Sequence, residues 1–132
     1  MDTRQLIANR MRTPDGTLMH SVHRHDYQEY VDKNGDTYVL DGGNDYIRCS
    51  INLIPAVNES VYADDPHDMI REVFLWGTYG KDGKQPFKRI ALEEMEDSHI
   101  QAILDTQSHI PYHVRKVFLD EQEYRIQHGI TK

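Results

Sequence analysis

The sequence predicts an α+β fold, in which an N-terminal antiparallel sheet of about four strands is packed by about three C-terminal helices. Two observations support this class. Up to residue 54 apolar and polar residues tend to alternate, which is typical of half-buried strands, whereas beyond residue 65 the apolar residues recur at helical spacing. The chain has 132 residues, 38% of them hydrophobic and 28% charged. Such a length and composition are typical of one globular domain, so we expect residues 1–132 to form a single domain.

The first half is predicted to hold one short helix and four strands. Asp2 or Thr3 is a suitable cap for a helix that runs through Arg10. Pro14-Asp15-Gly16 is a turn signal that ends this helix. The strands are expected over residues 18–24, 27–32, 36–40 and 46–54.

Two details of these strands can be tested against the structure. Asn34-Gly35 is a strong signal for a two-residue hairpin loop, which would place Val31 opposite Tyr38 and Glu29 opposite Leu40. In the strand over residues 46–54, Cys49 shares the apolar face with aliphatic neighbours. A thiol in that position is expected to be buried and unreactive.

The second half is predicted to hold three helices and one edge strand. Asp65-Pro66 begins the first helix and Gly77 ends it, because proline favours the first helical position and glycine the position after the last turn. The apolar side of this helix would consist of Met69, Ile70, Val73, Phe74 and Trp76. A polar loop over residues 78–86, an edge strand over residues 87–92 and a helix over residues 97–107 are expected to follow. The last helix would begin at Pro111 and end at Gly129.

Composition also excludes several classes of function. The net charge of −7 argues against a general nucleic-acid binder, because such proteins bind phosphates mainly through lysine and arginine. No stretch approaches the roughly 20 apolar residues of a membrane helix, and residues 1–5 lack the features of a signal peptide. Cys49 is the single cysteine, so no internal disulfide can form. We therefore expect a cytoplasmic protein without a membrane partner.

The densest group of potential metal ligands lies in residues 19–27. If this stretch is extended, His23 and His25 lie on one face of a strand and can share a metal ion. His20, Asp26 or the distant His67 would complete the site, and zinc or manganese would be the metal. The alternative is that these residues are polar surface groups that bind no metal, and no cofactor is firmly implied.

The glycine-rich loop after the first helix is the second candidate site. It fails the phosphate-binding pattern of the P-loop, since Thr78 replaces the first glycine and Gln85 replaces the required serine or threonine. We instead expect an exposed Tyr79 at the tip of the loop. With Trp76 it would anchor a partner, and Lys81 and Lys84 would lie at the rim. The alternative is that Trp76 closes the core.

Several segments occur together in an order that points to a known group of proteins. The chain resembles small, uncharacterised proteins encoded by tailed bacteriophages, although Glu96-Asp97 stands where those proteins tend to have a serine or threonine helix cap. The resemblance implies no activity and no catalytic residues. It implies expression in the cytoplasm of an infected bacterium. The segments that carry it are Arg12-Thr13-Pro14-Asp15-Gly16-Thr17, His23-Arg24-His25-Asp26-Tyr27, the Asp-Gly-Gly stretch of residues 39–44, residues 76–81 and His99-Ile100-Gln101-Ala102-Ile103-Leu104.

Two classes of function remain open at this point. The first is a phage accessory protein that binds a host or defence protein, or a small ligand, without catalysis. The second is a metal-dependent hydrolase or metal-binding domain that uses residues 20–26. The sequence favours the first, because motifs for catalysis are sparse. A host or phage protein is the expected partner, and a homo-oligomer is left open.

Overall fold

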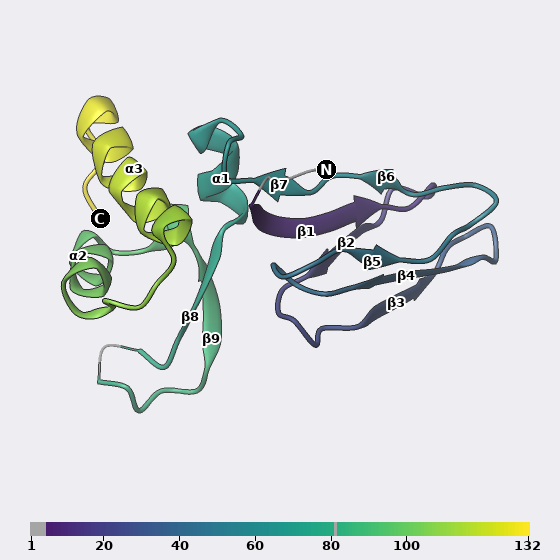
Figure 1. The fold of residues 1–132 in the computed structure, drawn as a ribbon, viewed down its shortest axis with the longest axis horizontal. Coiled ribbons are helices and arrows are strands. Elements are labelled where there is room, and N and C mark those ends of the chain that lie inside the picture. The colour runs from purple at the N-terminus through teal and green to yellow at the C-terminus, as the bar shows by residue number, and fades with distance from the viewer. Residues whose placement is uncertain (1–4, 81) are drawn as a thin grey trace. The chain divides into compact units, whose positions relative to one another are not determined.

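The computed structural model describes residues 5–80 and 82–132. The chain divides into two compact units, Met1–Asp64 and Asp65–Lys132. The first unit contains antiparallel sheets, and the second contains three α-helices and a β-hairpin (Figure 1). The predicted α+β class, with antiparallel strands first and helices after them, is confirmed. The prediction of a single domain stays a prediction.

The first unit is built from two antiparallel sheets. The longest strand, β1 (Leu6–Arg12), pairs with three others, and β4 is the middle strand of the second sheet. The side chains of Met11, Met19, Tyr38 and Leu40 form a buried apolar cluster of strands β1, β2 and β4. The first sheet contains β1, β2 (Leu18–Ser21), β6 (Val57–Asn58) and β7 (Val61–Tyr62), and the second contains β3 (Gln28–Val31), β4 (Thr37–Asp41) and β5 (Arg48–Cys49).

The predicted N-terminal helix is wrong, because its residues up to Arg10 lie mainly in β1. Four residues of β1 are buried, and the strand is paired with β2 on one side and with β6 and β7 on the other. This pairing with distant segments satisfies the backbone and outweighs the local helix signal. The proposed cap residues, Asp2 and Thr3, lie outside the described residues.

The β3–β4 hairpin is confirmed, but its predicted register is wrong by one residue. Val31 lies opposite Thr37, and Tyr30 lies opposite Tyr38. The loop has three residues, because Gly35 N donates to Asp32 O at 2.8 Å and Asp32 N donates to Asp36 O at 2.9 Å. Gly35 has φ +89°, whereas no other residue type among the described residues has positive φ. The loop is therefore a type I turn followed by a glycine bulge.

We expect Gly35→Val to lower the free energy of unfolding of the first unit by about 1 kcal/mol or more. A Cβ atom at this position would meet nothing within 4 Å, so the cost arises from the positive φ and not from a clash. Amide hydrogen exchange of the strands flanking the loop measures the effect. Lys33→Ala, in the same loop, is the control and should change stability by less than about 0.5 kcal/mol. Equal exchange rates in the valine variant and the wild type would contradict the assignment of strain to Gly35.

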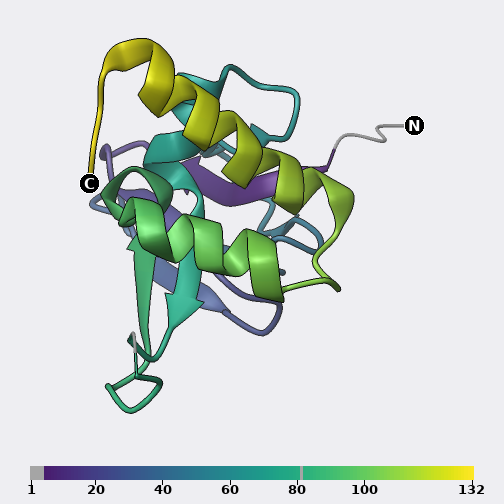
Figure 2. The ribbon, with the colours of Figure 1, turned by 90° about the vertical axis from the view of Figure 1, so that its left-hand side faces the viewer.

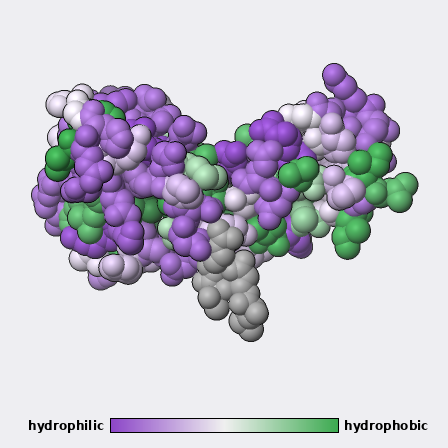
Figure 3. Space-filling model, turned by 90° about the horizontal axis from the view of Figure 1, so that it is seen from above, coloured by the Kyte–Doolittle hydropathy of each residue, from purple (hydrophilic) through white to green (hydrophobic). Residues whose placement is uncertain are grey.

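The predicted strand over residues 46–54 is also wrong, since only the two residues of β5 pair there. Ser50 N still donates to Val39 O at 3.1 Å, but two polar side chains make the other bonds to β4: Ser50 Oγ accepts from Val39 N at 3.0 Å, and Asn52 Nδ2 donates to Thr37 O at 2.8 Å. Serine and asparagine compete with strand pairing in this way. Ile51 and Leu53 are in consequence 102% and 97% exposed, and Cys49 is exposed and not buried as predicted. Figure 3 shows a group of green, hydrophobic side chains at the right-hand end of this view.

The second unit begins with α1 (His67–Val73), which is shorter than predicted. The chain leaves the helix at Phe74, and Trp76 lies on the strand β8 (Leu75–Thr78), paired with β9 (Lys88–Ala91). The predicted edge strand is confirmed by β9. The two later helices are confirmed by α2 (Asp97–Thr106) and α3 (Tyr112–His128), and a 3₁₀ turn, η1 (Leu92–Glu94), lies between β9 and α2.

An aromatic cluster forms the centre of the second unit. The buried ring of Phe118 meets Phe74 and Trp76 edge-on, with centroids 5.5 and 5.2 Å apart. Ile100 and Leu104 of α2 are buried as well, as their spacing predicted. Among the described residues, no helix combines the length and the apolar character that a membrane span requires.

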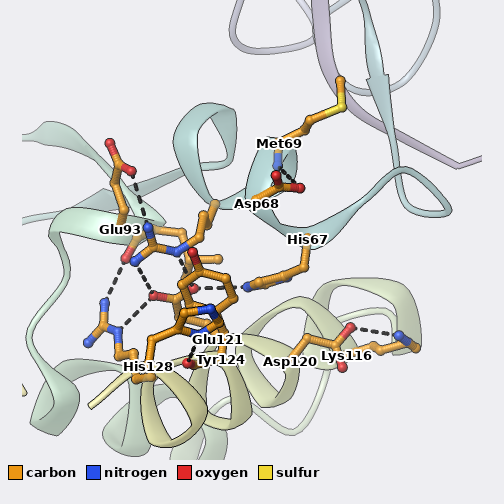
Figure 4. A network of polar contacts seen from close by, with 12 residues as sticks. His67, Asp68, Met69, Glu93, Lys116, Asp120, Glu121, Tyr124 and His128 are labelled. Atoms are coloured by element: carbon orange, nitrogen blue, oxygen red, sulfur yellow. Dashed lines mark hydrogen bonds and ion pairs between the residues drawn. The ribbon is translucent and has the colours of Figure 1, made fainter. Parts of the chain in front are cut away.

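The second unit also contains a buried carboxylate. Glu121 of α3 is 0% exposed and accepts hydrogen bonds from His67 Nε2 at 2.9 Å, from Arg71 Nε and NH2 at 3.0 Å each, and from Arg125 Nε at 2.7 Å (Figure 4). Arg125 also binds Asp97 Oδ1 at 2.6 Å and Leu92 O at 3.0 Å. These bonds connect α1, η1, α2 and α3 through a single side chain and its partners.

Candidate functional site

The histidine-rich segment is a turn and only partly a strand. Strand β2 ends at Ser21, and Asp26 N donates to His23 O at 2.9 Å, which closes the turn. His23 and His25 are exposed in this turn, so they do not share one face of a strand. The predicted extension of this strand to residue 24 is therefore wrong.

The other two residues of this cluster have local roles. Asp26 Oδ2 accepts from Val22 N at 2.8 Å, and Asp26 Oδ1 accepts from Gln28 Nε2 at 2.6 Å. Burial and the neighbouring Arg10 charge lower the pKa of His20, which favours its neutral form. Within residues 5–80 and 82–132, no three or more His, Cys, Asp or Glu side chains are grouped to hold a metal ion. A metal site at His20, His23, His25 and Asp26 stays a hypothesis.

The buried Glu121 is a structural group and not a catalytic one. Both of its oxygens already accept hydrogen bonds from the side chains around it, and solvent does not reach it. Burial alone would raise the pKa of Glu121, but the hydrogen bonds from His67, Arg71 and Arg125 outweigh burial and lower the pKa to about 2. A carboxylate that stays ionised and inaccessible at neutral pH cannot serve as a general acid or base.

The β8–β9 hairpin holds the predicted binding residues. Tyr79 is 57% exposed and Lys84 is exposed, as expected for a contact surface, whereas Lys81 lies outside the described residues. Trp76 is half-buried and packs against Phe118, so it contributes to the core of the unit. In Figure 2 the hairpin extends downward, away from α2 and α3.

Strand register gives the hairpin two different faces. Trp76 pairs with Ile90, and Gly77 pairs with Arg89. Because side chains alternate along a strand, Gly77, Tyr79, Phe87 and Arg89 share the face opposite to Trp76. We call this the outer face of the hairpin.

The outer face carries a continuous row of planar groups. The ring centroids of Tyr79 and Phe87 are 5.3 Å apart, and the Arg89 guanidinium carbon lies 4.9 Å from the Phe87 centroid. Tyr79 and Phe87 remain about half exposed. Sequence reasoning missed Phe87 and Arg89. The signal was their spacing of two residues in a predicted edge strand, but only the register with β8 shows that they join Tyr79.

Positive charge is concentrated in this hairpin. Residues 75–91 hold Lys81, Lys84, Lys88 and Arg89 against one acid, Asp82, which gives a net charge of +3. The rest of the chain therefore carries −7 − 3 = −10. No ion pair joins the side chains of Lys84, Lys88 or Arg89 to an acid in the described part of the chain. By the register of the hairpin, Lys88 is opposite Thr78 and shares the face of Trp76, whereas Arg89 lies on the outer face. An aromatic surface with this arginine, in a hairpin of net positive charge, is suited to binding an anionic partner.

Comparisons with known proteins identify no relative. The chain matches no protein-family model, and neither curated proteins nor solved structures give a significant match. The resemblance to bacteriophage proteins therefore remains an expectation that rests on the sequence segments alone. The candidate site is defined by the geometry of the hairpin.

Proposed function

We propose that this chain is a phage accessory protein that acts by binding, without catalysis, and that its partner is a protein of the infected bacterium. The outer face of the β8–β9 hairpin is the contact surface. One observation carries the proposal: Tyr79, Phe87 and Arg89 form an exposed row on the hairpin. Aromatic and arginine side chains are the residues that most often dominate the energy of protein interfaces.

The base of the hairpin is well suited to hold this row in place. Trp76 is fixed against Phe118 in the core, and four residue pairs connect β8 to β9. Leu92 N continues the pairing by donating to Phe74 O at 2.9 Å. Because the strands of the hairpin are already ordered before binding, little conformational entropy is lost when a partner binds. A larger part of the contact energy therefore contributes to the affinity.

We expect Tyr79→Ala to weaken partner binding by about 2 kcal/mol, or about 30-fold in Kd. The melting temperature should stay nearly unchanged, because Tyr79 is exposed and contributes little to the core. Partners are first captured from phage-infected bacterial cells with the wild-type chain, and the dissociation constant of each is then measured with both proteins.

Tyr112→Ala is the matched control for this measurement. Tyr112 lies at the start of α3 in the same unit and is also strongly exposed, but it is not part of the outer face. Its removal should leave Kd unchanged. If Tyr79→Ala keeps the affinity for every captured protein, or if it unfolds the second unit, the hairpin is not the contact surface.

A further inference from the structure

We propose that the outer face of the hairpin binds an acidic segment of a protein, which places a side-chain carboxylate on Arg89 and an apolar side chain on the rings of Tyr79 and Phe87. This inference rests on the proposed binding function and names the chemistry of the partner. Three features of the hairpin support it: the free donors of Arg89, the fixed position of the Phe87 ring, and the local charge.

Arg89 differs from most arginines of the chain. Its guanidinium carbon lies 4.9 Å from the centroid of the Phe87 ring, and none of its N–H groups has a hydrogen-bond partner in the described part of the chain. A guanidinium edge matches both oxygens of a carboxylate. The arginines that already have a carboxylate partner are Arg10, Arg12, Arg24, Arg48, Arg71 and Arg125.

The Phe87 ring packs over Gly77, which lies diagonally across the hairpin from it. A Cβ atom on Gly77 would lie 2.7 Å from two atoms of the ring, so the ring lies directly against the backbone of β8. Tyr79 on one side and Arg89 on the other complete the row. A partner side chain of the size of leucine could cover both rings next to the carboxylate that Arg89 binds, and such burial would add the hydrophobic part of the affinity.

The charge distribution favours an acidic protein segment over a nucleic acid. The hairpin offers four cations in all, while the remainder of the chain carries −10. Affinity for nucleic acid increases with the number of phosphates neutralised, and four cations can neutralise about four at most. A short acidic segment can be bound by the hairpin alone, and its apolar residues can pack on the rings of Tyr79 and Phe87.

Binding is tested on the full chain by fluorescence anisotropy with a labelled peptide of alternating glutamate and leucine. We expect a saturable complex, and we expect the same peptide with glutamine in place of glutamate to bind about tenfold more weakly or worse. Arg89→Gln should cause a similar loss. Arg89→Lys should restore only part of the affinity, because lysine keeps the charge but not the paired donors.

Arg24→Gln is the control for net charge. Arg24 is exposed in the first unit and pairs with Asp45 at 3.6 Å, so its replacement changes the total charge as Arg89→Gln does and leaves every residue of the hairpin unchanged. It should leave peptide affinity unchanged. Equal losses in the two variants would overturn the proposal, since the peptide would then respond only to overall charge.

Two further outcomes separate this inference from the proposed function. If oligothymidylate binds more tightly than the acidic peptide and also depends on Arg89, the partner is a nucleic acid and the inference is overturned. If the acidic peptide fails to bind but Tyr79→Ala still weakens the binding of a captured partner, the outer face is the contact surface and the inference that its partner is an acidic segment is wrong. If Tyr79→Ala loses no partner, the proposed function itself falls.

Discussion

Replacing Glu121 by glutamine is expected to lower the free energy of unfolding of the second unit by about 3–5 kcal/mol. The carboxylate is fully buried and faces two arginines, Arg71 and Arg125, which would lose their shared negative charge. Glutamine preserves the shape of the side chain but removes its charge, so that Arg125 keeps only Asp97 as a carboxylate partner and Arg71 keeps only Glu93. Trp76, the only tryptophan of the chain, packs in the core of this unit. Its fluorescence during urea unfolding therefore measures the effect.

The matched control is the neighbouring residue on α3. Asp120 pairs with Lys116 at 2.6 Å, but both side chains are exposed to solvent (Figure 4). Asp120→Asn also removes one negative charge from an ion pair, and we expect a loss of less than about 1 kcal/mol. Similar losses in the two variants would show that burial does not strengthen the dependence on Glu121.

The same carboxylate should make the second unit sensitive to acid. Its pKa of about 2 in the folded state lies below the 4.5 of an ordinary glutamate. A lowered pKa stabilises the fold at every pH above about 4.5, and this contribution is lost as the pH falls toward 2. The loss amounts to about 3 kcal/mol for this difference in pKa.

Urea unfolding at a series of pH values between 6 and 2.5, followed by Trp76 fluorescence, tests the acid dependence. Asp97 contributes in the same direction, because Lys132 N and Arg125 lower its pKa. Asp97→Asn should therefore keep most of the slope, whereas Glu121→Gln should remove most of it. A wild-type stability that stays constant from pH 5 to pH 3 would contradict the hydrogen-bonding account of Glu121.

The segments that the sequence predicted well are those that carry their own signals. Helix α2 has a periodic apolar face, and α3 is bounded by Pro111 and Gly129, so each could be assigned without knowledge of its neighbours. Strand β1 could not be assigned in this way. Its partners β6 and β7 lie about 50 residues further along the chain, and no local pattern records that pairing.

The candidate site shows the same division. Tyr79 was predicted because an aromatic residue within a glycine-rich loop stands out in the sequence. Arg89 was missed because its significance depends on the register between β8 and β9 and on the absence of an acid opposite it. Glu121 was missed for a similar reason, since Arg71 lies 50 residues before it.

The exposed Cys49 gives the chain a chemical handle that a buried thiol would not. It is the only cysteine and belongs to the first unit, and Trp76 is the only tryptophan and belongs to the second. A single maleimide dye on Cys49 would form a donor–acceptor pair with Trp76 without any engineered substitution. The efficiency of energy transfer between these two natural positions, measured with and without a partner bound to the hairpin, would show whether binding moves one unit relative to the other.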